Sequence, residues 1–259
     1  DDDADRHPLP RGVGDRKLRP RGVMAVDLYG LPADYDALRA VCAEHGLFLM
    51  EDAAQSFGAE YKGRKACSLG DVAATSFFPA KPLGCYGDGG MIFTDRDDVA
   101  EVCRSLLVHG KGRDKYDNVR IGLNARLDTL QAAILLAKFE AFPEELKARQ
   151  QAAARYTEGL MDRRPTVTPP VVPEGFLSAW AQYTVRAQDS ETRRLLMDRL
   201  KAAGIPTVVY YPKPLHLQTA FAHLGYRPGD FPISEAASQT VFSLPFGPYL
   251  TAEIGRAHV

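Results

Sequence analysis

The sequence predicts an α/β fold, with a mostly parallel sheet in a larger first domain and a smaller α/β domain after it. Its 259 residues are 45% hydrophobic and 25% charged, which is enough apolar content for one large or two modest domains. Short apolar segments alternate with helical patterns through the first half, as in sheets whose parallel strands are joined by helices. Prolines cluster between residues 165 and 173, and a second alternation follows them.

The first domain is expected over residues 23–145. Its predicted strands are Val23–Asp27, Leu47–Met50, Val72–Phe77 and Gly90–Thr94, and its predicted helices are Tyr35–His45 and Val99–Val108. A longer helical pattern covers Arg126–Phe139. It is expected to break near Pro143 and to resume over Arg149–Met161, because proline removes a helix hydrogen bond. The apolar face of this helix indicates packing or a subunit contact.

The second domain is expected over residues 146–252, entered through the end of that helix. Its predicted strands are Gln182–Ala187, Pro206–Tyr210 and Phe242–Leu244, and its predicted helices are Glu191–Ala203 and Ser234–Thr240. Residues 1–22 have little apolar periodicity, which favours a frame-shifted or truncated gene start over a basic arm. Residues 253–259 resemble a translated adapter, so His258 is set aside as a ligand.

Composition excludes several classes of function. Lys and Arg total 32 against 33 Asp and Glu, so no bulk positive field attracts nucleic acid or an anionic membrane. No apolar run approaches a membrane span, and the four cysteines lack the spacing of a zinc site. We therefore expect a cytoplasmic protein with buried, reduced cysteines and no metal.

Two charged residues lie where chemistry is expected. Asp52 ends an apolar strand, and ligands of open α/β sheets bind at the carboxyl ends of strands. Its carboxylate could hold a ribose, a metal or a cationic ring nitrogen, or it could cap the next helix. Lys81 lies in an apolar loop shaped by proline and glycine, where desolvation would make its amine a nucleophile, unless it is an ordinary surface lysine.

The glycines from Gly87 to Gly90 allow a close backbone approach to a ligand. They lack the spacing of dinucleotide-binding and P-loop motifs, which disfavours both of those sites. No zinc-protease motif, nucleophile elbow or Cys/His pair occurs either.

Four motifs appear in order: E-D-A-A-Q-S-F-G-A, T-S-F-F-P-A-K-P-L-G-C-Y-G-D-G-G, G-L-N-A-R-L-D-T-L-Q-A-A-I-L and Y-Y-P-K-P-L-H-L-Q. Together they resemble the DegT/StrS-type sugar aminotransferases, and the resemblance extends from about Val23 to Thr251. It implies the aspartate-aminotransferase fold (fold type I), pyridoxal 5'-phosphate (PLP) as cofactor, and a nucleotide-linked keto-sugar as substrate. Members of this family begin with a further subdomain that precedes the position of Val23.

The resemblance also implies site residues. Lys81 would form the Schiff base with PLP, and Asp52 would pair with its ring nitrogen. Gln55 would contact the ring, Ser76 the phosphate, and Asn124 the phosphate from a neighbouring subunit. The remaining implied residues are three that would bind substrate: Arg126, Tyr211 and His216. Arg126 could clamp a carboxylate of the sugar or of the donor.

Alternatives stay open for three of these residues. Ser76 could be an internally bonded strand hydroxyl, His216 a packed loop histidine and Arg126 a surface charge at a helix start.

The motif wording is closest to family members that act on a UDP-linked 3-keto-uronic acid of N-acetylglucosamine for surface polysaccharide, with glutamate as amino donor, in a homodimer. Two other functions compete. A PLP-dependent sugar dehydratase of the same family is disfavoured by Lys81, since such relatives often carry histidine there. The second competing interpretation is an inactive fragment that binds a sugar nucleotide.

Overall fold

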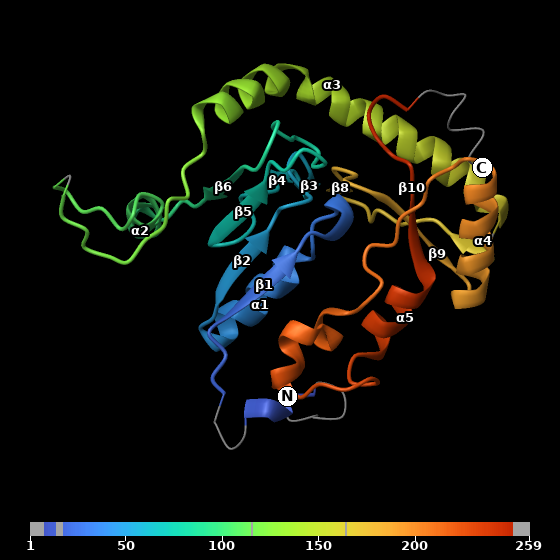
Figure 1. Ribbon diagram of the computed structural model, residues 1–259, viewed down its shortest axis with the longest axis horizontal. Helices are drawn as coiled ribbons and strands as arrows, with labels where there is room; N and C mark the ends of the chain where they lie inside the picture. Colours follow the sequence, from blue (N-terminus) through green and yellow to red (C-terminus); the bar gives the residue numbers. More distant parts are fainter. Residues whose placement is uncertain (1–7, 14–17, 115, 164, 251–259) are drawn as a thin grey trace.

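The computed structural model describes residues 8–13, 18–114, 116–163 and 165–250, and its first half is built around one four-stranded sheet (Figure 1). The strand order is β1-β2-β5-β6. The strands β1, β2 and β5 are parallel, and β6 is antiparallel to β5. The strands span Gly22–Val26 (β1), Phe48–Asp52 (β2), Val72–Ser76 (β5) and Gly90–Phe93 (β6). The expected mostly parallel sheet is confirmed.

Helix α1 (Tyr35–His45) shows why the sequence folds this way locally. The Asp34 side chain accepts a hydrogen bond from the Ala37 N–H at its start. Gly46 ends the helix with a φ of 61°, a conformation that favours glycine. Tyr35 and Cys42 are buried against β1 and β2, so α1 covers one face of the sheet.

A short hairpin and its partner form a second, small sheet in the order β4-β3-β8. Its strands are β3 (Glu60–Tyr61), β4 (Arg64–Lys65) and β8 (Phe176–Leu177). Two-residue strands are too short to give a periodic pattern, so the sequence did not predict them. The sheet joins the first half of the chain to residues beyond 170.

Helix α3 (Thr129–Leu160) is continuous, so the expected break near Pro143 is wrong. It follows α2 (Asp97–Leu106) and arches over the molecule in Figure 1. Its buried side chains lie on both sides of the proline, Leu135 and Phe142 before or next to it and Ala153 and Tyr156 after it. Packing at both ends holds the helix together despite the missing hydrogen bond.

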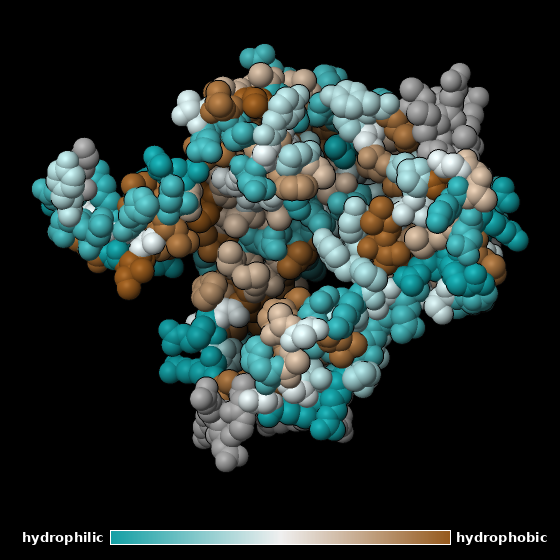
Figure 2. Space-filling view, in the orientation of Figure 1, coloured by the Kyte–Doolittle hydropathy of each residue, from teal (hydrophilic) through white to brown (hydrophobic). Residues whose placement is uncertain are grey.

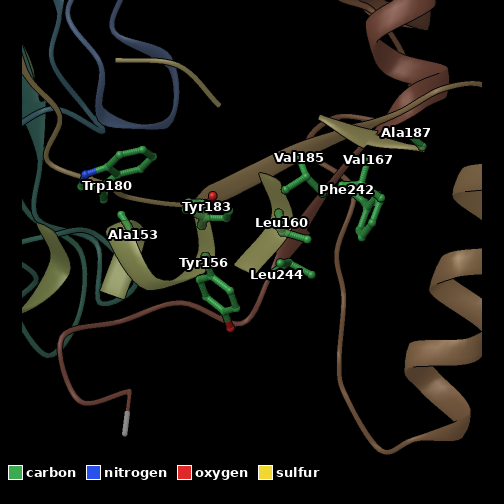
Figure 3. Close-up of a cluster of buried hydrophobic side chains, with 10 residues drawn as sticks. All are labelled: Ala153, Tyr156, Leu160, Val167, Trp180, Tyr183, Val185, Ala187, Phe242 and Leu244. Carbon is green, nitrogen blue, oxygen red and sulfur yellow. The ribbon is translucent and has the colours of Figure 1, made fainter. Parts of the chain in front are cut away.

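The C-terminal part contains an antiparallel sheet in the order β10-β9-β7, flanked by α4 and α5. Its elements are β7 (Val167–Thr168), β9 (Tyr183–Ala187), α4 (Ser190–Ala202), α5 (Pro232–Thr240) and β10 (Val241–Leu244). Figure 3 shows its core, in which Tyr156 and Leu160 of α3 pack beside Tyr183, Phe242 and neighbouring apolar side chains.

The predicted strand Pro206–Tyr210 is wrong. Only Val208 pairs with the sheet, through two backbone hydrogen bonds with Ser243. Pro206 has no N–H to donate, and Pro212 and Pro214 follow closely, so the ladder cannot extend. The long helix begins at Thr129, three residues later than predicted, and the other predicted helices and strands are confirmed with ends shifted by at most two residues.

Of the two end segments, residues 11–13 form a 3-10 turn in which Arg11 pairs with Asp230 at 2.5 Å. Residues 253–259 lie outside the described residues.

Candidate active site

Lys81 lies in a tightly bonded loop between β5 and β6. The Lys81 N–H donates to the Phe78 carbonyl at 2.9 Å, and the Cys85 N–H closes the loop on the Phe77 carbonyl at 2.8 Å. A Cβ on Gly84 would come within 2.7 Å of the Phe78 and Pro79 carbonyl oxygens, so only glycine fits there. The loop therefore presents Lys81 from a rigid base.

Helix α3 supports the same loop. The Lys138 ammonium donates to the Gly84 carbonyl at 2.6 Å. Leu83 and Cys85 are buried beside Leu135 of α3. The long helix thus fixes the loop that carries Lys81.

Asp52 ends β2, and its charge acts on Lys81. Burial lowers the pKa of the Lys81 amine, and the negative charge of Asp52 partly offsets that effect. Asp52 Oδ1 accepts from the Ala54 N–H at 3.1 Å, but a turn rather than a helix follows. Asp52 therefore does not cap a helix, and its carboxylate is available to a ligand.

Gln55 and Ser76 lie on the segments that follow β2 and end β5. Gln55 is buried, and its Oε1 accepts from the Tyr29 N–H at 2.5 Å. Ser76 Oγ accepts from the Phe78 N–H at 3.2 Å, which leaves the hydroxyl hydrogen as a donor. Because β2 and β5 are parallel neighbours, Asp52 and Ser76 end at the same edge of the sheet.

Tyr29 is a further residue at this edge, which sequence reasoning missed. Its hydroxyl donates to the Tyr210 carbonyl, and its N–H holds Gln55. Its φ of 62° is unusual for a residue other than glycine. Tyr29 therefore connects the Gln55 segment to the loop of Tyr211. The sequence signal that could have identified this residue is the pair Tyr29-Gly30 directly after a strand, which indicates a tight turn.

Tyr211 and His216 lie in the C-terminal part but line different cavities. Tyr211 is exposed beside Tyr29 and Lys213 in a cavity of about 500 Å³. His216 lines a neighbouring apolar cavity of about 310 Å³. Its Nε2 lies 3.0 Å from Glu235 Oε1, and its ring packs on Phe231. His216 is thus held as a packed histidine, separate from the wall that contains Tyr211.

Asn124 and Arg126 lie on an exposed segment that precedes α3. Arg126 Nε donates to Asn124 Oδ1 at 3.0 Å, and both side chains are exposed. This segment, residues 107–128, is called the arm below, because it extends away from the body in Figure 1. In the described part of the chain, neither Asn124 nor Arg126 forms a hydrogen bond or ion pair with Lys81 or Asp52.

These residues suit PLP. An amine of lowered pKa, a nearby carboxylate and a hydroxyl donor match the carbonyl, ring nitrogen and phosphate of that cofactor. Among the described residues, no group of three or more His, Cys, Asp or Glu could hold a metal ion. Nor does any helix in the described part of the chain have the length and apolarity to span a membrane.

Comparison with known proteins identifies the family. Residues 13–256 match the model of the DegT/DnrJ/EryC1/StrS aminotransferase family. The chain belongs to this family. Over 237 residues it is 48% identical to the UDP-2-acetamido-2-deoxy-3-oxo-D-glucuronate aminotransferase of Pseudomonas aeruginosa, covering 91% of this chain and 64% of that protein. The chain thus spans less than two thirds of that relative's length.

Solved structures agree with this DegT-family assignment. A DegT DnrJ EryC1 StrS aminotransferase from Brucella abortus matches with a TM-score of 0.89 and 46% identity, over 97% of this chain and 66% of that one. S. venezuelae DesV, solved in complex with a ketimine intermediate, matches with a TM-score of 0.87 and 39% identity, over 97% and 67%. The predicted aspartate-aminotransferase fold is confirmed, and PLP is the cofactor of the family.

Proposed function

We propose that the protein carrying this chain moves an amino group from glutamate to the keto carbon of a nucleotide-linked sugar. The products are an amino sugar and 2-oxoglutarate, so atoms and electrons balance across two half-reactions. The observation that carries the proposal is the half-buried amine of Lys81, held on its bonded loop, with a lowered pKa and within the electrostatic reach of the Asp52 carboxylate. The sugar that we propose is a UDP-linked 3-keto-uronic acid, which fits the name of the relative at 48% identity.

Lys81 and Asp52 have distinct roles in this proposal. When bound, PLP supplies an electron sink for the carbon that loses a proton. Lys81 takes that proton and returns it at the neighbouring position, and its lowered pKa favours the neutral amine that this transfer needs. Asp52 holds a proton on the ring nitrogen of the cofactor.

The other residues bind and orient. Ser76 donates its hydroxyl to the phosphate, and Gln55, held by the Tyr29 N–H, forms a wall beside the ring. Tyr211 lines the cavity that would take the sugar nucleotide. His216, paired with Glu235, would support that cavity from the adjacent cluster.

A homodimer would complete the site. The support is the arm, on which Asn124 and Arg126 are exposed together with Ile121 and Leu123, whose exposed fractions are 99% and 71%. Figure 2 shows hydrophobic residues gathered where this arm joins the body. Contiguous exposed apolar side chains mark interaction surfaces. We assign Asn124 to the phosphate and Arg126 to a substrate carboxylate in the partner subunit, in a cytoplasmic enzyme of polysaccharide-sugar synthesis.

The experiment that tests the cofactor site is absorbance spectroscopy of the purified protein with added PLP, before and after borohydride. We expect a visible band that borohydride removes, with the label found on Lys81 by peptide mapping. Lys147→Ala is the matched control, because Lys147 is an exposed helix lysine paired with Glu144. A label on another lysine, or no label, would overturn the proposed function.

A further inference from the structure

A buried acidic cluster lies directly beneath the Asp52–Gln55 segment. Asp27 follows β1, and Glu51 precedes Asp52 in β2. Both are completely buried, as are Tyr35 and Ser56. The backbone N–H of Asp27 donates to the Asp52 carbonyl at 3.1 Å, so the cluster and the site share one strand end. Buried carboxyl groups are costly, so each needs its partners.

The Asp27 carboxylate joins two loops. Its Oδ1 accepts from the Tyr35 hydroxyl at 2.8 Å and from the Ala33 N–H at 3.1 Å. Its Oδ2 accepts from the Ser56 hydroxyl at 2.7 Å. One carboxylate therefore holds the loop 28–33 to the segment 53–56.

A second link closes the same connection. Gln55, next to Ser56, accepts from the N–H of Tyr29, and Tyr29 lies within the loop that Asp27 holds. The position of the Gln55 side chain thus depends on where Asp27 keeps that loop. The Tyr29 hydroxyl extends the link to Tyr210.

Glu51 is the second carboxyl group of the cluster. Its two oxygens accept from the Cys67 N–H at 2.6 Å and the Leu69 N–H at 2.8 Å. Its carboxyl group also interacts with that of Asp27, and two buried carboxyl groups that interact in this way favour a state in which one is protonated. Burial raises the pKa of Glu51 to about 7, and the charge of Asp27 adds to that rise.

The groups that face the pair come from three elements. Asp52 lies at the end of β2, Tyr35 at the start of α1, and the Cys67 thiol in the loop that follows β4. Burial, and then the charge of Asp27, raise the pKa of Tyr35, so the Tyr35 hydroxyl remains a donor. Asp27 accepts from more donors than Glu51 does, so Asp27 carries the charge and Glu51 the proton.

We propose that Asp27 is a positioning residue for the reaction proposed above, acting with Glu51 to hold Gln55 and the Tyr29 loop against the cofactor side of the site. The inference rests on the proposed function. It adds a pair that contacts neither cofactor nor substrate but determines where the residues that do so lie.

The test compares Asp27→Asn with Asp34→Asn in the protein that carries this chain. Asp34 is a matched control, because it also accepts from a tyrosine hydroxyl (Tyr61, 2.7 Å) and a backbone N–H (Ala37), but it has no bond to the 53–56 segment. For Asp27→Asn we expect borohydride to label Lys81 with PLP as before, while kcat falls about ten- to a hundredfold with little change in KM. Asp34→Asn should lose stability only.

A measurement of stability against pH without cofactor tests whether Asp27 and Glu51 act as a pair. The raised pKa of Glu51 means that the folded chain binds this proton more tightly than the unfolded chain does. This difference stabilises the fold fully below pH 4.5, the ordinary pKa of the group, and the stabilisation is lost as the pH rises through about 7. In Asp27→Asn burial still raises the pKa of Glu51 but the added effect of the Asp27 charge is gone, so the loss of stability should shift to lower pH. In Asp34→Asn the loss should stay near pH 7.

Three outcomes would decide the inference. Unchanged kcat and an unchanged pH step in a labelled Asp27→Asn protein would overturn it, and so would an equal fall in kcat in Asp34→Asn. If Asp27→Asn does not fold, Ser56→Ala can replace it, because it removes only one of the three bonds that the Asp27 carboxylate accepts. Ser56→Ala should also lower kcat, and an unchanged kcat in that variant would overturn the inference. If the unmodified protein shows no label on Lys81, the proposed function fails instead.

Discussion

The Lys81 loop and the arm differ in how the chain supports them. The loop is held by its own backbone, by Lys138 of α3 and by buried side chains on both flanks. The arm is bridged within itself, by Val108 with Asn124 and Lys111 with Asn118. It bonds to the end of α2 through the Leu123 N–H, which donates to the Leu106 carbonyl at 2.8 Å, and it exposes Ile121 and Leu123. The Lys81 loop is thus supported within this chain, whereas the arm exposes apolar side chains that another surface would have to cover.

This difference separates the two halves of the proposed site. The half that performs proton transfer, Lys81 and Asp52, is assembled by the sheet and α3. The half that recognises charged groups, Asn124 and Arg126, is exposed on the arm, where the two side chains bond to each other, while Leu127 beside them packs against the cluster of the Lys81 loop. Chemistry and recognition should therefore respond differently to substitution.

The largest effect is expected for Lys81→Ala. Because no other group stands in for the amine in that loop, transamination should fall by at least about 10³-fold. Steady-state kinetics with the keto-sugar and glutamate measure it, and Lys147→Ala should keep normal turnover. Substantial activity in the Lys81 variant would break the assignment of the loop as the chemical half.

Asp52→Ala should have the next largest effect. The variant should still bind some PLP, since Lys81 and Ser76 remain, but kcat should fall roughly 10²–10³-fold because no carboxylate keeps the ring nitrogen protonated. PLP binding is followed by absorbance, and kcat in the same preparation. Wild-type kcat would remove Asp52 from the site.

Local sequence signals predicted most helices and strands that carry the candidate site, but not the contacts between segments far apart in the sequence. The Asp34 cap and Gly46 define α1, and the strand ends place Asp52 and Ser76 at one edge. Pro143 misled, because helix packing at both ends outweighed a local rule. The pairing of His216 with Glu235 and the bonds of Asp27 depend on contacts far apart in sequence, which no periodicity shows.

Arg126→Ala sharpens the comparison by separating substrate recognition from chemistry. If Arg126 pairs with the sugar carboxylate, the protein should prefer the UDP-linked keto-uronic acid over the neutral keto-sugar by about ten- to a hundredfold in kcat/KM, the value of one charge-assisted pair. The variant should lose that preference and spare the neutral sugar. Measuring each half-reaction alone guards against a role in glutamate binding, because slowing of only the glutamate half-reaction would reassign Arg126 to the donor.

The smallest expected signal comes from mixing Lys81→Ala, which is inactive, with Arg126→Ala, which is weakened on the keto-uronic acid, and it tests whether the arm serves a partner subunit. With random exchange about half of the dimers contain one chain of each kind. If each site takes Lys81 from one subunit and Arg126 from the other, one of the two sites in such a dimer has both residues intact. About a quarter of all sites should then recover activity on the keto-uronic acid. If both residues come from the same subunit, every site in a mixed dimer lacks one of them, and no activity returns.

A mixture of Lys81→Ala with Asp52→Ala is the control that must stay inactive, because both residues lie in the half that one chain assembles. Recovery in the first mixture but not in the control would mean that the arm completes the site of its neighbour, and that its exposed apolar residues are covered by a second copy of the chain.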